Sequence, residues 1–357
     1  MSVVRVLVVE DSLTVRGHIV EVLSATPGFE VVGEAGDGKT GIELCARLRP
    51  DVVTMDMMLP VMTGLAATEY IMAYCPTPIL IVSASTNRGE LFKTYDALAA
   101  GAVDVLDKPL GTEPDDAWGR RLVAALRIVA KIRVITHPRA KLGGLASQNR
   151  VAPTPLPSSL PRVVGIGAST GGPGAVLSIL RALPADFPAP LLLVIHISEP
   201  FGLALAEWLD SQCPLPVRYA RDGEALPGLG QASVLMAPPE FHLELQGVRL
   251  SLGRGPERHS CRPSVDVLFE SLARSSGPEA LACLLTGMGR DGAAGMLLVK
   301  DAGGLTVAQD ERTSVVFGMP GAAVSLGAAR HVLPLDEIGP FLLQTCQRPA
   351  KGRAGTR

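Results

Sequence analysis

The chain has 357 residues, 47% of them hydrophobic and 19% charged, so it is long enough for two globular domains and is not one small module. Its formal net charge of -2 lacks the basic excess typical of nucleic-acid binders. None of the six cysteines forms a CxxC pair, no apolar run is long enough to span a bilayer, and the opening residues do not resemble a secretory leader. These features predict a soluble cytoplasmic protein with no nucleic-acid partner and no direct membrane insertion.

Residues 1–134 alternate short apolar runs with longer helix-like segments, which predicts an α/β domain with a doubly wound parallel sheet. The runs are continuously apolar, as strands buried on both faces are. Residues 115–134 are amphipathic and predict the last helix of the domain. The five predicted strands are residues 3–10, 29–35, 51–56, 77–84 and 102–109.

Residues 135–161 are rich in Pro, Ser, Ala and Gly and carry basic but no acidic residues, which predicts a flexible linker. The α/β rhythm returns over residues 162–347 and predicts a second, Rossmann-like doubly wound domain. Residues 348–357 are expected to be a disordered tail. The strands of the second domain are predicted at residues 162–168, 190–197, 232–239, 280–287 and 304–310.

Polar side chains follow the strands of the first predicted sheet. Glu10 and Asp11 end the first strand, and Asp56 ends the third. Because the carboxyl ends of parallel strands converge, these carboxylates can share one pocket and bind a hard cation such as Mg²⁺. Ser83 and Lys108 follow the fourth and fifth strands, and both suit a phosphoryl group. Each acid taken alone is also explained as a solvated loop residue.

The segments VVEDS, TMDMMLP, VSAS and VDVLDKP together resemble the receiver domain of bacterial two-component response regulators. The resemblance implies a flavodoxin-like fold and phosphorylation of Asp56 by a histidine kinase. It also implies that the three carboxylates hold Mg²⁺ and that Ser83 and Lys108 read out the phosphate. Receivers commonly have an aromatic switch residue three positions before the lysine, and this chain has Val105 there.

The second domain opens with RVVGIGASTGGPG, an apolar run that breaks into a glycine-rich turn with Ser169 at its crest. A serine between a strand and a helix meets solvent and unpaired backbone N–H groups, which suits a nucleophile. Such a turn is equally typical of a phosphate loop in which the serine donates to a nucleotide. A dinucleotide site calls for an acid at the end of the next strand, but that strand ends in His196. This disfavours a nucleotide-dependent oxidoreductase.

His196 is placed to act as a general base toward Ser169, although a satisfied buried histidine is the alternative. Asp291 follows the apolar strand at residues 280–287 and stands near the start of the next helix, where a capping role is also possible. All three side chains follow predicted buried strands, whose carboxyl ends we expect at one sheet edge. This disposition predicts a hydrolytic triad of Ser169, His196 and Asp291, since a triad is defined by its geometry and not by the order of its residues.

The segments GIGASTGGP, CRPSVDVLFESLA, LLTGMGRDGAAGM and QDERTSVVFGMPGAAV, with the strand-end histidine, resemble the CheB family of chemotaxis protein-glutamate methylesterases. The resemblance implies a serine hydrolase that demethylates γ-glutamyl methyl esters, and can deamidate glutamines, on methyl-accepting chemoreceptors. A histidine kinase of the CheA type would be the phosphodonor. The hydrolase itself would need no cofactor.

In this interpretation Ser169 attacks the acyl carbon, and backbone N–H groups around Thr170, Gly171 and Met288 stabilise the oxyanion. The receiver is expected to cover the hydrolase until Asp56 is phosphorylated. The alternative from another class is a non-catalytic adaptor or phosphate sink that only binds receptors. Release of methanol from a methylated receptor distinguishes the two.

Overall fold

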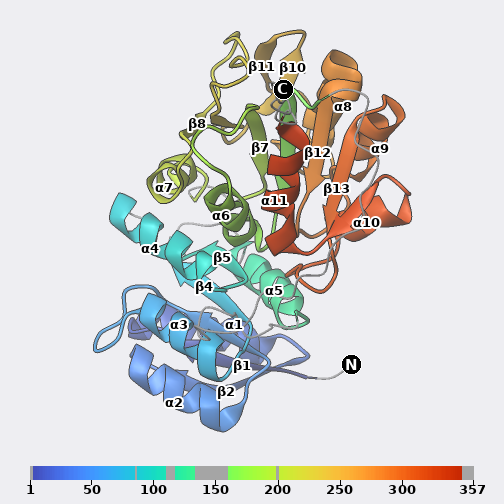
Figure 1. The fold of residues 1–357 in the computed structure, drawn as a ribbon. Coiled ribbons are helices and arrows are strands. Elements are labelled where there is room, and N and C mark those ends of the chain that lie inside the picture. The colour runs from blue at the N-terminus through green and yellow to red at the C-terminus, as the bar shows by residue number, and fades with distance from the viewer. Residues whose placement is uncertain (1–2, 85–86, 110–116, 133–159, 198–200, 348–357) are drawn as a thin grey trace, which may run out of the picture. The chain divides into compact units, whose positions relative to one another are not determined.

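The structure is a computed structural model that describes residues 3–84, 87–109, 117–132, 160–197 and 201–347 (Figure 1). These residues form two compact units, each with its own parallel sheet. Almost all of the predicted linker at 135–161, and all of the predicted tail at 348–357, lie outside the described residues. Within the described ranges no helix is both long enough and apolar enough to cross a bilayer.

The first unit contains a five-stranded parallel sheet with strand order β2-β1-β3-β4-β5. This is the flavodoxin-like order, so the predicted fold class is confirmed. Helix α1 contacts α5, while α2 contacts α3 and α3 contacts α4, as expected for helices on two faces of the sheet. The elements are β1 Val4–Val9, α1 Leu13–Ala25, β2 Phe29–Ala35, α2 Gly38–Leu48, β3 Val52–Met55, α3 Gly64–Tyr74, β4 Ile79–Ser83, α4 Arg88–Ala99, β5 Asp104–Asp107 and α5 Ala117–Val129.

The second unit contains a seven-stranded parallel sheet with strand order β14-β13-β12-β6-β7-β9-β8. The chain enters at β6, moves outward through β7, and returns on the other side of β6 with β12. The strands are β6 Val163–Ala168, β7 Leu191–Ile195, β8 Val217–Tyr219, β9 Val234–Met236, β12 Ala280–Leu284, β13 Leu305–Gln309 and β14 His331–Leu333. The helices from β6 onward along the chain are α6 Gly172–Ala182, α7 Leu205–Gln212, α8 Val265–Ser276, α9 Ala293–Asp301, α10 Met319–Ser325 and α11 Leu335–Cys346.

This topology has a switch point between β6 and β12, the neighbouring strands from which the chain proceeds in opposite directions. In open α/β sheets, ligands bind beyond the carboxyl ends of the strands at such a point. The strand order therefore places the expected site beyond the ends of β6, β7 and β12.

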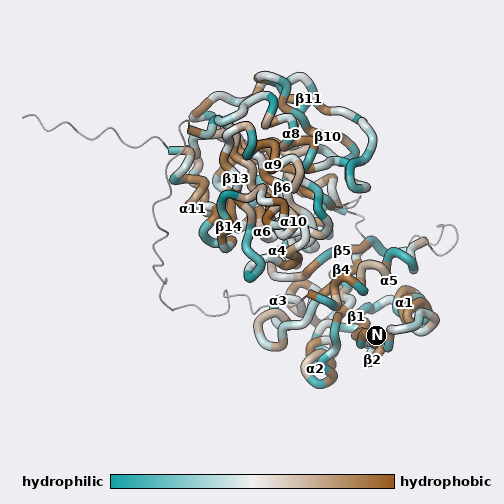
Figure 2. Tube along the Cα trace, turned by 90° about the vertical axis from the view of Figure 1, so that its right-hand side faces the viewer, coloured by the Kyte–Doolittle hydropathy of each residue, from teal (hydrophilic) through white to brown (hydrophobic). Residues whose placement is uncertain are grey.

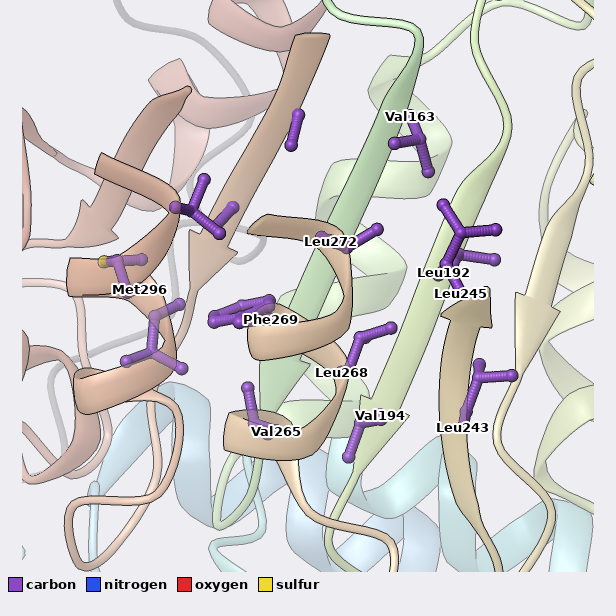
Figure 3. Close-up of a cluster of buried hydrophobic side chains, with 14 of the residues drawn as sticks. Val163, Leu192, Val194, Leu243, Leu245, Val265, Leu268, Phe269, Leu272 and Met296 are labelled. Atoms are coloured by element: carbon purple, nitrogen blue, oxygen red, sulfur yellow. The ribbon is translucent and has the colours of Figure 1, made fainter. Parts of the chain in front are cut away.

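Helix α8 packs on β6, β7 and β12 and forms one side of the core of the second unit (Figure 3). Figure 2 shows hydrophobic segments along strands such as β6 and β13. A Cβ atom at Gly165 would lie 2.5 Å from Leu272 Cδ1, and one at Gly167 would lie 2.3 Å from Val265 Cγ1. Because such contacts are too short for real side chains, glycine at these positions allows α8 to approach β6 closely. This contact fixes the first turn of α8 relative to the end of β6.

All ten predicted strands correspond to observed strands. The predictions missed two edge strands, β8 and β14, which have three residues each. They also missed an antiparallel hairpin formed by β10 His242–Gln246 and β11 Arg249–Gly253. Strands this short give little periodic signal. In the hairpin, apolar residues alternate with polar ones, so it has no continuous apolar run.

Candidate active site

The three residues predicted as a triad lie just beyond the ends of neighbouring parallel strands. Ser169 follows β6, His196 follows β7, and Asp291 lies beyond the end of β12. The backbone N–H of His196 donates to the carbonyl of Ala168 at 2.9 Å, and that of Ser169 donates to the carbonyl of Thr286 at 3.0 Å. The backbones of the three segments are therefore tied together at this edge.

His196 and Asp291 form a close pair, with 2.9 Å between Nε2 of the imidazole and Oδ2 of the carboxylate. The His196 side chain is 14% exposed and that of Asp291 only 2%. The Coulomb attraction between groups this well shielded from water is stronger than it would be at the surface. The carboxylate thus holds the imidazole in one orientation, as the acid of a triad does.

The carboxylate of Asp291 is held by the first turn of α8. Its Oδ1 accepts from Ser264 Oγ at 2.8 Å and from the backbone N–H of Asp266 at 3.1 Å. Its Oδ2 accepts from the backbone N–H of Val265 at 2.7 Å, in addition to His196. Unpaired N–H groups and the helix dipole both favour an anion at this position. Asp291 is not the N-cap of its own following helix, because Gly292 occupies that position in α9.

The pKa values of the pair follow from these contacts. Burial alone would raise the pKa of Asp291, but the hydrogen bond and charge of His196, with the hydrogen bonds from Ser264 and the backbone N–H of Val265, outweigh it and lower the pKa. Burial alone would lower the pKa of His196, but hydrogen bonds to Asp291 and Cys261 outweigh it and raise the pKa to about 9. The resting pair is therefore an imidazolium and a carboxylate at neutral pH.

The other ring nitrogen of His196, Nδ1, lies 3.7 Å from the sulfur of Cys261. Among the hydrogen bonds of the described residues, none joins His196 to Ser169. Nδ1 is nevertheless the nitrogen left to exchange a proton, because Nε2 is committed to Asp291. The structure thus pairs two of the three predicted triad members directly and places the third at the same sheet edge.

Two turns flank Ser169. Gly171 has a φ of 76°, in the left-handed region that favours glycine. A Cβ atom on Gly287 would lie 2.8 Å from Cβ of Ser169, so the TGMG turn passes directly beside the serine. Within the described residues, the backbone N–H groups of Gly171 and Met288 donate to no protein acceptor. Such free donors suit an oxyanion.

Two more of the predicted site residues lie in these turns. Thr170 is half-buried in the turn between β6 and α6. The Met288 side chain is 51% exposed.

In the first unit, the residues predicted to bind a cation and a phosphoryl group lie together. Glu10, Asp11 and Asp56 each offer an oxygen within 4.8 Å of the others. The ammonium of Lys108 lies 2.8 Å from Glu10 Oε1 and 3.0 Å from Asp56 Oδ2. Ser83 is buried at the end of β4 and accepts a hydrogen bond from Thr94 Oγ1 at 3.4 Å.

This carboxylate cluster fits a divalent cation. Glu10 is 1% and Asp56 2% exposed, and Glu10 Oε2 has no hydrogen-bond partner within the described part of the chain. Asp56 Oδ2 lies near Lys108 but outside hydrogen-bond geometry. Burial raises the pKa of Glu10 even though Lys108 donates to it. Buried anionic oxygens with unused lone pairs are the ligands that Mg²⁺ prefers.

Two contributors to the site were not singled out from the sequence. Ser264 is the N-cap of α8 and binds Asp291, and the segment Ser264-Val265-Asp266 has a recognisable helix-start pattern, but nothing in it indicates a distant carboxylate. Cys261 lies beside His196 although 65 residues separate them in the sequence. Both contacts arise from tertiary packing.

Comparisons with known proteins agree with this architecture. Residues 6–114 match the family model for the response regulator receiver domain, and residues 164–342 match that for CheB methylesterase. A relative from Anaeromyxobacter dehalogenans, named protein-glutamate methylesterase/protein-glutamine glutaminase 2, is 45% identical over 94% of this chain and 95% of its own. A similarly named relative from Myxococcus xanthus is 44% identical over 95% of this chain and 96% of its own.

Among solved structures, the catalytic domain of Thermotoga maritima CheB methylesterase is 38% identical, with a TM-score of 0.49 over 52% of this chain and 98% of that one. A receiver followed by a hydrolase-type α/β domain defines a response regulator with an enzymatic output domain. Because its relatives match it over nearly its full length, the chain belongs to the CheB methylesterase family.

Proposed function

We propose that this chain is a protein-glutamate methylesterase that hydrolyses γ-glutamyl methyl esters on methyl-accepting chemoreceptors, and glutamine amides at such sites. The observation that carries the proposal is the His196–Asp291 pair, held by the first turn of α8 at the sheet edge where Ser169 ends β6. A non-catalytic adaptor is not favoured, because it would need no such pair. The names of the relatives support the same activity.

In the proposed mechanism, the hydroxyl of Ser169 attacks the ester carbonyl while Nδ1 of neutral His196 accepts its proton. Asp291 stabilises the resulting imidazolium through Nε2. The imidazolium then protonates the leaving methoxide, and methanol departs. A water molecule activated by His196 hydrolyses the acyl-enzyme and restores the glutamate; an amide substrate would release ammonia instead.

The developing oxyanion would be bound by the backbone N–H groups of Gly171 and Met288, with Thr170 in the same turn as Gly171. These donors belong to backbone positioned before the substrate arrives, so no reorganisation is needed during the reaction. One such donor typically contributes about 3 kcal/mol of transition-state stabilisation. The two glycine-rich turns would therefore contribute on the same scale as the side chains.

The direct test is methanol release from a methylated chemoreceptor cytoplasmic fragment incubated with the purified full chain. We expect methanol and restored glutamate in equal amounts. Absence of methanol from a folded, phosphorylatable chain would favour the adaptor alternative.

The ionisation of His196 predicts that hydrolysis accelerates with pH. Because its pKa is raised to about 9, the neutral imidazole that a general base requires is the minor form at pH 7. Below that pKa, kcat/KM should rise about tenfold per pH unit and then level off. A profile of kcat/KM from pH 6 to about 10, recorded in chelator-containing buffer, measures this. A plateau already reached at pH 7 would contradict it.

The first unit is proposed to regulate the second through phosphorylation of Asp56 by a histidine kinase of the CheA type. Glu10, Asp11 and Asp56 would hold Mg²⁺, which when bound would neutralise the charge of the incoming phosphoryl group. Lys108, already 3.0 Å from Asp56, would bind the phosphoryl oxygens, and Ser83 would donate its hydroxyl to them. The added charge would rearrange this edge of the receiver.

Asp56→Asn is expected to abolish stimulation of methanol release by a small phosphodonor while leaving the basal rate in place. The asparagine amide cannot form an acyl phosphate, whereas the hydrolase residues are unchanged. The measurement is the ratio of rates with and without the phosphodonor, and Asp51→Asn, an exposed acid just before β3, is the matched control. Equal stimulation of Asp56→Asn and the unsubstituted chain would remove Asp56 from this role.

A further inference from the structure

Cys261 introduces a thiol into the candidate active site that the proposed hydrolysis does not use. Its sulfur lies 3.7 Å from Nδ1 of His196, the nitrogen that would accept the proton of Ser169. Cys261 is only partly buried, and the His196 side chain is 14% exposed, so the pair is not sealed from solvent. Together with Asp291 they form a cluster whose ligand atoms lie within 4.8 Å of one another.

The spacing of sulfur and nitrogen matches that of two ligands on one zinc ion. Zn–S bonds of about 2.3 Å and Zn–N bonds of about 2.0 Å in a tetrahedral arrangement separate the two ligand atoms by about 3.5 Å. The observed 3.7 Å between Cys261 Sγ and His196 Nδ1 needs almost no movement to accept such an ion. A thiolate and an imidazole also favour zinc over Mg²⁺, which prefers oxygen.

Asp291 contacts the other nitrogen of the His196 ring, as the second partner of a zinc-binding histidine does. Histidines that bind zinc usually donate their second ring N–H to a carboxylate, which orients the ring and makes the coordinating nitrogen more basic. Here Nε2 of His196 lies 2.9 Å from Asp291 Oδ2, and the carboxylate is itself fixed by Ser264 and Val265. The contacts that would prepare His196 for catalysis thus also prepare it for zinc.

We infer that Cys261 and His196 form a zinc site whose occupation inhibits the hydrolase. Zinc would displace the protons of Nδ1 and of the Cys261 thiol, which pass to solvent, and would then occupy the Nδ1 lone pair that takes the proton of Ser169, so ester hydrolysis stops. Because only two protein side chains bind the ion directly, with water in its remaining positions, binding is reversible by a chelator. The inhibitory consequence rests on the proposed function, whereas the binding itself does not.

Binding is tested by calorimetric titration of Zn²⁺ into the full chain, with excess Mg²⁺ present to occupy the receiver carboxylates. We expect Cys261→Ser and His196→Gln each to weaken zinc binding at this site at least about tenfold. Cys213→Ser is the matched control, since Cys213 is also partly buried but outside the cluster. Co²⁺ used as a probe should give a thiolate-to-metal absorption band that Cys261→Ser loses.

The zinc site is ruled out if Cys261→Ser and His196→Gln bind Zn²⁺ as tightly as the unsubstituted chain, or if Co²⁺ gives no thiolate band. Inhibition is tested separately by methanol release with Zn²⁺ and after chelation, each variant being compared with its own zinc-free rate, and zinc should not lower the rate of Cys261→Ser. Binding without inhibition would overturn the inhibitory role. If the chain released no methanol even without zinc, the proposed function would fail while the binding result would still stand.

Discussion

Ser169→Ala is expected to lower kcat for methyl ester hydrolysis by about 10⁶-fold, the size of loss known for removal of a serine nucleophile from a triad. Without Oγ no acyl-enzyme can form, and His196 and Asp291 have no proton to transfer from that position. The turn should persist, because the backbone N–H of Ser169 still donates to Thr286. Methanol release under single-turnover conditions measures the effect.

The matched control is Ser178→Ala, an exposed serine on α6, the helix that follows the same turn. It should retain full activity, and both variants should accept phosphate at Asp56 as the unsubstituted chain does. Substantial methanol release by Ser169→Ala would assign the nucleophile to another residue.

The strands that hold the candidate site could be predicted from the sequence, because a central parallel strand is covered on both faces and must be apolar throughout. Strand β6 (Val163–Ala168) and strand β12 (Ala280–Leu284) are wholly buried, and both were predicted from their apolar runs. The edge strands β8 and β14 were missed, since a strand with one neighbour is short and carries a mixed pattern. Local composition therefore indicates the centre of a sheet better than its margins.

The candidate site was predictable to the extent that topology alone determines it. A strand end is recognisable in the sequence, so Ser169 and His196 could be expected at one edge, and so could the carboxylates of the first unit. Which donors surround Asp291 could not be foreseen, because Ser264 and Val265 reach it only through the packing of α8 against β6 and β12. The position of Cys261 beside His196 has the same origin.

Asp291→Asn is expected to reduce kcat by about 10⁴-fold, the loss observed when a triad aspartate becomes asparagine. The carboxylate accepts from His196, Ser264 and the backbone N–H groups of Val265 and Asp266. An asparagine has only one acceptor oxygen, so its NH₂ group must face donors on one side. His196 then loses the partner that favours its cationic form, and its pKa should fall.

The same substitution should also destabilise the second unit, since leaving buried donors unsatisfied typically costs about 1–3 kcal/mol. The two effects separate if kcat is measured well below the unfolding transition and stability is measured by denaturant titration. Asp301→Asn, an exposed acid at the end of α9, is the control and should change neither quantity. If Asp291→Asn lost stability but kept kcat within about tenfold, the carboxylate would serve only as a cap for α8. Replacing the aspartate of a triad by asparagine lowers kcat far more than that. Loss of kcat in a stably folded variant would instead assign Asp291 to the chemistry.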